Sequence, residues 1–156
     1  MPSQSSQNSK TLGRFFEQLY NLTDLKPLST PMDHQVHLSS DQAPASAAEC
    51  TMMHDIPYHK AISALNWAIL VMRPDITFAV TTVAQFAFNP GPAHWEAIKW
   101  IFCFLSGMCN LWLTDGKTST PLEGYADADS SMSEDCHAIS GYTFLIDGSA
   151  ILWSSK

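Results

Sequence analysis

The chain has 156 residues, 46% of them apolar, which is enough for one ordinary domain or slightly more and excludes a disordered polypeptide. Its formal net charge is −7, with 15 acidic against 8 basic residues, and no two basic residues are adjacent. Because binding to a phosphate backbone needs clustered Lys and Arg, the composition argues against autonomous nucleic-acid binding.

The apolar patterning shows no secretory signal, and the longest apolar runs are too short to span a membrane. The four cysteines form no Cys-x-x-Cys pair, so we expect reduced thiols in a soluble, intracellular chain. Cys136-His137 is a weak zinc candidate, since no second ligand pair has suitable spacing. His34-x-x-His37 lies in a polar stretch, and we interpret it as a solvated loop.

The first part of the chain is predicted to be irregular. Residues 1–13 are rich in Ser and Gln and are expected to be disordered. The spacing of Phe15, Phe16 and Leu19 predicts a short amphipathic helix over residues 12–22. From Thr23 to Ala48, the Pro, Ser, Asp and His content predicts an extended crossing or a loop.

Helical periodicity begins at Pro57, which opens the first of three predicted helices. Its apolar residues recur at helical spacing: Ile62, Leu65, Ile69 and Met72. Alanines on a second face predict that this helix is covered on most sides. Arg73-Pro74-Asp75 ends it and starts the next helix, since Pro suits the first helical position and Asp the positive end of the helix dipole.

The second and third helices are predicted to complete a compact helical layer. The second has the apolar stripe Ile76, Val80, Val83 and Ala87. Asn89-Pro90-Gly91-Pro92 is a stop and a restart. The third helix has the stripe Trp95, Ile98, Phe102 and Leu105 and ends near Gly107. His94 opens this helix, where a capping or packing role outweighs a catalytic one.

After Asn110 the pattern changes to that of strands. Short strands are predicted at Leu111–Leu113, after which Asp115-Gly116 makes a turn, and at Leu122–Asp127. Tyr142, Phe144 and Ile146 alternate with other side chains on a third strand. Asp147-Gly148 suits a primed hairpin turn, and Ala150–Trp153 is the returning strand.

Several short motifs occur along the chain in a fixed order. They are Lys26-Pro27-Leu28-Ser29-Thr30-Pro31-Met32, Pro57-Tyr58 with Ala61-Ile62-Ser63-Ala64-Leu65, Arg73-Pro74-Asp75-Ile76-Thr77-Phe78-Ala79-Val80, Asn89-Pro90 with Ala93-His94-Trp95, Gly124-Tyr125-Ala126-Asp127-Ala128-Asp129, Ser140-Gly141-Tyr142 and Trp153-Ser154-Ser155-Lys156. From about residue 14 to the end, this ordered set resembles the Pol polyprotein of copia-type LTR retrotransposons, where reverse transcriptase ends and RNase H begins.

The resemblance implies an α+β chain. Residues 14–115 would be a three-helix thumb/connection-like layer from the end of reverse transcriptase. Residues 116–156 would be a truncated, three-stranded antiparallel portion of an RNase H-like fold. Asp127 would be the leading catalytic, metal-binding carboxylate, with Mg²⁺ as cofactor only if the complete RNase H site is present. The family partner is an RNA–DNA hybrid, which this acidic fragment alone is not expected to bind.

The chain also departs from the family pattern. Ser130 follows the Asp-x-Asp pair where the family usually has Trp, and Cys103 and Ser106 lie near positions that are usually basic. Asp127 and Asp129, two apart on a strand, share one face and supply at most part of a two-metal site. The other family carboxylates follow the hairpin, and this chain ends first. Tyr125-Ala126-Asp127 is similar to the polymerase Tyr-x-Asp-Asp motif but lacks its adjacent acids.

We therefore expect a non-catalytic fragment, in which Asp127 is a strand-end acid kept by descent. Two alternatives stay open: a segment of a longer active reverse transcriptase/RNase H polyprotein, and a helical host interaction module. The oligomeric state is left open. The face of Tyr142, Phe144 and Ile146 lacks a covering helix, so the hairpin is expected to be marginal alone, to pack on the helical layer, or to need a partner.

Overall fold

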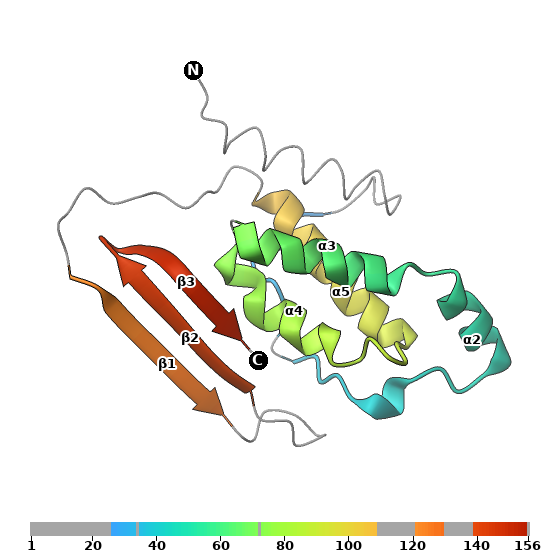
Figure 1. Ribbon diagram of the computed structural model, residues 1–156. Helices are drawn as coiled ribbons and strands as arrows, with labels where there is room; N and C mark the ends of the chain where they lie inside the picture. Colours follow the sequence, from blue (N-terminus) through green and yellow to red (C-terminus); the bar gives the residue numbers. More distant parts are fainter. Residues whose placement is uncertain (1–25, 34, 72, 109–120, 130–138, 156) are drawn as a thin grey trace.

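The computed structural model describes residues 26–33, 35–71, 73–108, 121–129 and 139–155. They form a layer of helices beside a three-stranded antiparallel sheet, which confirms the α+β class (Figure 1). The predicted helix 12–22, the strand Leu111–Leu113, the Asp115-Gly116 turn and the disordered segment 1–13 lie outside the described residues.

The first described elements are a 3₁₀ turn, η1 (Ser40–Gln42), and the helix α2 (Ala47–His54). The interpretation of Thr23 to Ala48 as irregular is confirmed for the described residues 26–33 and 35–46 apart from η1, but it does not predict α2. Its start is a capping box: Ser46 Oγ accepts a hydrogen bond from the Glu49 amide at 3.2 Å, and Glu49 Oε2 accepts one from the Ser46 amide at 3.2 Å. Hydrogen bonds from the Ser46 and Ala45 amides hold the pKa of Glu49 below its usual range.

Helix α3 (Tyr58–Val71) follows Pro57 as predicted, and its stripe of Ile62, Leu65 and Ile69 is buried. The expectation that this helix is covered on most sides is wrong. Trp67 is 52% and Leu70 79% exposed, so one face of α3 carries large apolar side chains in solvent. The alanine positions therefore indicate where other elements pack closely on α3. They do not indicate that the face with Trp67 and Leu70 is left uncovered.

The next two helices complete the layer. A 3₁₀ turn, η2 (Pro74–Ile76), leads into α4 (Thr77–Ala84), and α5 (Pro92–Gly107) begins with Pro at its first position, as expected. Their stripes meet α3 in one apolar core. The Tyr58 hydroxyl crosses that core and donates to the Val83 carbonyl at 2.7 Å, near the end of α4. Burial raises the pKa of this phenol above its usual range.

His94 is a buried structural residue at the start of α5. Its Nδ1 accepts a hydrogen bond from the Gly91 amide at 2.8 Å, and its Nε2 lies 3.1 Å from the Ser39 carbonyl. The imidazole also stacks on Phe86, with ring centroids 4.2 Å apart. The predicted capping and packing role is confirmed, because the His94 ring contacts both Gly91 at the start of α5 and Ser39 just before η1.

The sheet has the order β1-β2-β3, with β1 (Glu123–Asp129), β2 (Ile139–Ile146) and β3 (Ser149–Ser155) in sequence. Asp147 and Gly148 form the turn between the last two strands with φ of 52° and 75°, the left-handed pair that a type I′ hairpin requires. The predicted strands are confirmed with small shifts at their ends. Compatibility with an RNase H-like fold goes no further than these three antiparallel strands.

The sheet contacts the helical layer through β3, while β1 forms the far edge (Figure 1). Trp153 Nε1 donates to the Ile69 carbonyl at 3.2 Å, and Thr81 Oγ1 donates to the Ser155 carbonyl at 3.2 Å. Ile69 lies in the last turn of α3, where carbonyls lack a partner within the helix, so the indole satisfies one of them. The hairpin thus packs on the helical layer, one of the three predicted outcomes.

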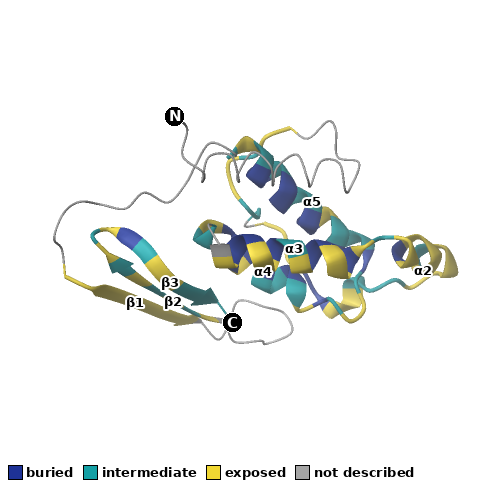
Figure 2. Cartoon of the chain, turned by 45° about the horizontal axis from the view of Figure 1, so that its top comes forward, coloured by how far each residue is buried: buried dark blue, intermediate teal, exposed yellow. Residues whose placement is uncertain are grey.

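The opposite face of the sheet is open. Tyr142, Phe144 and Ile146 are 43%, 36% and 45% exposed, and β1 is exposed along its described side chains (Figure 2). The prediction that this face lacks cover is confirmed for the described part of the chain.

None of the helices in the described part of the chain has the length and apolar character needed to cross a bilayer.

Candidate functional site

Asp127 lies on β1, opposite Gly141 of β2. In an antiparallel ladder, residues directly opposite one another point to the same face, and Gly141 is in turn opposite Ser155 of β3. The register therefore places Asp127 on the face of the sheet that bears Thr143 and Trp153. Since the Trp153 indole contacts α3, this is the face turned toward the helices.

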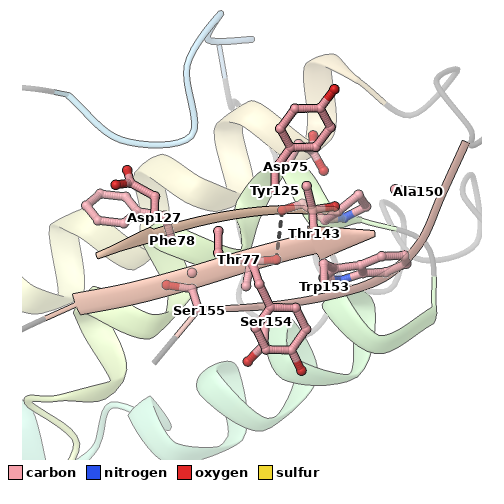
Figure 3. Close-up of a pocket in the computed structure, with 14 residues that line it drawn as sticks. Asp75, Thr77, Phe78, Tyr125, Asp127, Thr143, Ala150, Trp153, Ser154 and Ser155 are labelled. Atoms are coloured by element: carbon pink, nitrogen blue, oxygen red, sulfur yellow. Dashed lines mark hydrogen bonds between the residues drawn. The ribbon is translucent and has the colours of Figure 1, made fainter. Parts of the chain in front are cut away.

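A cleft of about 800 Å³ separates this face from η2 and the start of α4 (Figure 3). Phe78, which is 41% exposed, projects from α4 close to Asp127, and Tyr125 lies toward Asp75. Thr77 and Trp153 also line the space. The predicted site residue is therefore at the junction of the two layers, between aromatic rings and a few polar groups.

Asp75 is the other carboxylate that lines the cleft among the described residues, and it is already engaged. Arg73 Nε donates to Asp75 Oδ1 at 2.9 Å, and Arg73 Nη2 donates to Oδ2 at 2.7 Å. The same guanidinium lies over the Phe104 ring, 5.6 Å from its centroid, and the Arg73 side chain is 11% exposed. The Arg-Pro-Asp motif thus forms a two-point ion pair, and the contact of its guanidinium with Phe104 links the motif to α5.

The donor set does not fit a pair of magnesium ions. Within the described residues, no group of three or more His, Cys, Asp or Glu side chains gathers closely enough to hold a metal. The predicted metal ligand Asp127 is present, but the Asp129 side chain and Cys136-His137 lie outside the described residues, as does His34. The part of the chain that the structure describes therefore provides one unengaged carboxylate in the cleft.

Two of the four cysteines lie within the described residues, and both Cys50 and Cys103 are free thiols. Burial raises the pKa of the Cys103 thiol, on α5, which disfavours its nucleophilic thiolate form. The Cys103 side chain is half-buried.

The sequence singles out Asp127 as a candidate, and it does not point to most of the residues that line the cleft around it. The sequence pattern predicts that Phe78 and Thr77 lie on a helix and Trp153 on a strand. Their meeting depends on the docking of β3 against α4, which joins positions more than 70 residues apart. The one sequence signal for this meeting is that Trp153-Ser154-Ser155 belongs to the same ordered motif set as the Arg-Pro-Asp segment.

The chain is similar to retrovirus-related Pol polyproteins. It is 40% identical over 138 residues to the polyprotein from transposon TNT 1-94 of Nicotiana tabacum, a match that covers 88% of this chain and 10% of that polyprotein. It is 31% identical over 139 residues to the polyprotein from transposon RE1 of Arabidopsis thaliana, covering 87% of this chain and 9% of the relative. No protein-family model matches the chain, and no solved structure matches it significantly.

A shorter relative has a different description. Secreted RxLR effector protein 161 of Plasmopara viticola is 36% identical over 106 residues, which are 67% of this chain and 75% of that protein. These relatives define the chain as a homologue of retrovirus-related Pol polyproteins. The chain belongs to the family of Pol polyproteins from copia-type transposons. It spans about a tenth of the length of the Pol polyproteins that it matches.

Proposed function

We propose that this chain is a non-catalytic segment of a copia-type Pol polyprotein, descended from the junction between reverse transcriptase and RNase H. The ancestral role would be RNA-directed DNA synthesis, with RNase H cleavage of the RNA–DNA hybrid. The similarity to two transposon polyproteins over most of this chain supports the origin. The geometry around Asp127 supports the absence of cleavage by this chain alone.

The observation that carries the proposal is the state of the two cleft carboxylates. Cleavage with two metal ions needs several carboxylates that converge on the same point, because the metals stabilise both the attacking and the leaving oxygen. Asp75 is neutralised by its two hydrogen bonds from Arg73, so it is a poor ligand. Asp127 by itself would hold at most a weakly bound, hydrated ion.

The charge of the chain supports the same conclusion about partners. A net charge of −7 opposes the approach of a polyanionic hybrid, and Arg73, which lies beside the cleft, is already paired. We therefore propose that the chain alone neither binds an RNA–DNA hybrid nor requires Mg²⁺. The free thiols Cys50 and Cys103 are compatible with the reducing, intracellular setting that forms part of this proposal.

The test is cleavage of a labelled RNA–DNA hybrid by the full chain with and without Mg²⁺. We expect the wild type, Asp127→Asn and a matched control, Glu123→Gln on the same strand, to give equal background rates. Magnesium-dependent cleavage that survives in Glu123→Gln and is lost in Asp127→Asn would overturn the proposal. Cleavage that all three variants retain would identify a contaminating nuclease.

A second candidate is favoured by the level of identity to the longer relatives. At 40% identity to the tobacco polyprotein, this segment could still contribute Asp127 to a site completed by other parts of a longer chain. Replacing the matched segment of that polyprotein with this chain tests it directly. Hybrid cleavage by the chimaera, lost on Asp127→Asn, would support this candidate, and an inactive chimaera that still folds would reject it.

A further inference from the structure

The outer edge of β1 has no backbone partner among the residues that the structure describes. The sheet order puts β1 at one end, and β3, at the other end, is the strand that contacts the helices. The side chains of residues 123–128 of β1 are exposed (Figure 2). Such an edge offers a row of amides and carbonyls that can pair with another extended segment.

One face of β1 is acidic. Glu123, Tyr125 and Asp127 alternate along the strand and therefore point to the same side. The Tyr125 hydroxyl donates to Glu123 Oε2 at 3.0 Å and so fixes the direction of that carboxylate. A strand added at this edge would place its own alternate side chains directly beside two carboxylates with an aromatic ring between them.

The other face of β1 is small and apolar. Gly124 and Ala126 leave a hollow of about 460 Å³, which Tyr142, Phe144 and Leu152 also line. The Phe144 ring covers Gly124 so closely that a Cβ there would lie 2.7 Å from it. Because diagonal neighbours on adjacent strands come within reach of long side chains, an added strand can put apolar groups into this hollow.

We propose that the free edge of β1 binds an extended peptide in which basic and apolar residues alternate, as a fourth strand of the sheet. Backbone hydrogen bonds provide the pairing. Lys or Arg side chains lie beside Glu123 and Asp127, and the apolar side chains lie over the hollow beside Phe144. This surface and its occupant are independent of any cleavage reaction.

A second copy of the chain is a poor occupant of the same edge. Antiparallel pairing of two β1 strands about Tyr125 would set Glu123 of each copy opposite Asp127 of the other. Parallel pairing in register would set each carboxylate beside its own counterpart. Like charges directly opposite one another destabilise a strand pair, so the edge selects against self-association and for a basic segment.

The test uses capped synthetic peptides of seven residues, the length of β1, titrated into the full chain labelled with ¹⁵N. One peptide alternates Lys and Val, a second alternates Glu and Val, and a third is the Lys peptide with every amide N-methylated. We expect the amides of β1 to shift with the Lys peptide, about tenfold tighter binding than for the Glu peptide, and no binding of the methylated form.

Two charge changes sharpen the assignment. Glu123→Lys should reduce the preference for the Lys peptide to about threefold or less, whereas Asp41→Lys, the same change at an exposed site in η1, should leave it unchanged. If the amide spectrum shows that Glu123→Lys does not fold, Asp127→Lys replaces it. Equal affinity for the two charged peptides, shifts confined to the helices, no binding at millimolar peptide, or a dimer through β1 would each overturn the proposal.

Discussion

The helical layer and the sheet hold together in different ways. Within the described residues, the buried apolar side chains lie between Leu38 and Leu105, in the helical layer and the segments that flank it. The sheet adds the half-buried Trp153 to the margin of that core. Its apolar residues Tyr142, Phe144 and Leu152 stay exposed. The layer is therefore stabilised by its own core, whereas the sheet depends on its turn, its ladder and its contact through β3.

Matched leucine truncations in the two regions should give the largest difference. Leu65 on α3 is fully buried, whereas Leu152 on β3 is 52% exposed. Leu65→Ala should lower the free energy of unfolding by about 2–5 kcal/mol, because it loses apolar burial and leaves a cavity. Leu152→Ala should cost less than about 1 kcal/mol. Urea denaturation followed by circular dichroism measures both, and equal losses would show that the sheet has a core of its own.

The sequence was sufficient for the regular elements with strong local signals. Helical spacing located α3, α4 and α5, Pro74 and Pro92 marked two helix starts, and Asp147-Gly148 fixed the hairpin turn. The capping box that begins α2 was also readable, as Ser46 three residues before Glu49, but the high density of Pro and Ser around it concealed it. Local patterns failed where the outcome depends on packing, as in the exposure of Trp67 and Leu70.

The candidate site shows the same division. Asp127 is a candidate from the sequence because it belongs to a strand motif in an ordered family pattern, and its place in the cleft follows from the strand register. The Arg73–Asp75 pair could not, since two residues that flank Pro74 signal a helix boundary and not a bidentate contact. The cleft could not be predicted from the sequence for a similar reason. Its walls come together only because Trp153 and Thr81 join β3 to the helices.

The response to alkaline pH should also separate the two regions. Burial raises the pKa of Tyr58, so the folded chain holds this phenolic proton more tightly than the unfolded chain. The stabilisation is complete below about pH 10 and is lost as pH rises further, by up to about 1.4 kcal/mol per pH unit. Tyr58→Phe should flatten this decline. The pKa of Tyr125 on exposed β1 is also raised, mainly by the hydrogen bond to Glu123 and the charge of that carboxylate, which solvent screens. Tyr125→Phe should therefore flatten the decline less than Tyr58→Phe, as unfolding titrations at pH 9 and pH 11 would show.

A result in which both phenylalanine variants flatten the decline equally would contradict the comparison. It would mean that the hydrogen bond and the charge of Glu123 raise the pKa of exposed Tyr125 as effectively as burial raises that of Tyr58. Tyr58→Phe alone should also remove a buried hydrogen bond to the Val83 carbonyl, a loss of about 1 kcal/mol at neutral pH. The two effects are separated by comparing how steeply the free energy of unfolding falls between pH 9 and pH 11, and not its value at one pH.

The smallest change tests how the two regions are joined. Trp153→Phe keeps an aromatic ring against the core but removes the hydrogen bond to the Ile69 carbonyl, which should cost about 0.5–1.5 kcal/mol. Because the indole joins the sheet to α3, we expect faster hydrogen exchange at Thr143 and Leu145 and unchanged exchange at Leu65. Trp100→Phe is the control, since it removes an indole hydrogen bond of the same kind, to the Thr30 carbonyl, without touching the sheet. Exchange that accelerates in the helices as much as in the strands would show one cooperative unit, and the exposed sheet would then be stabilised by more than its single contact strand.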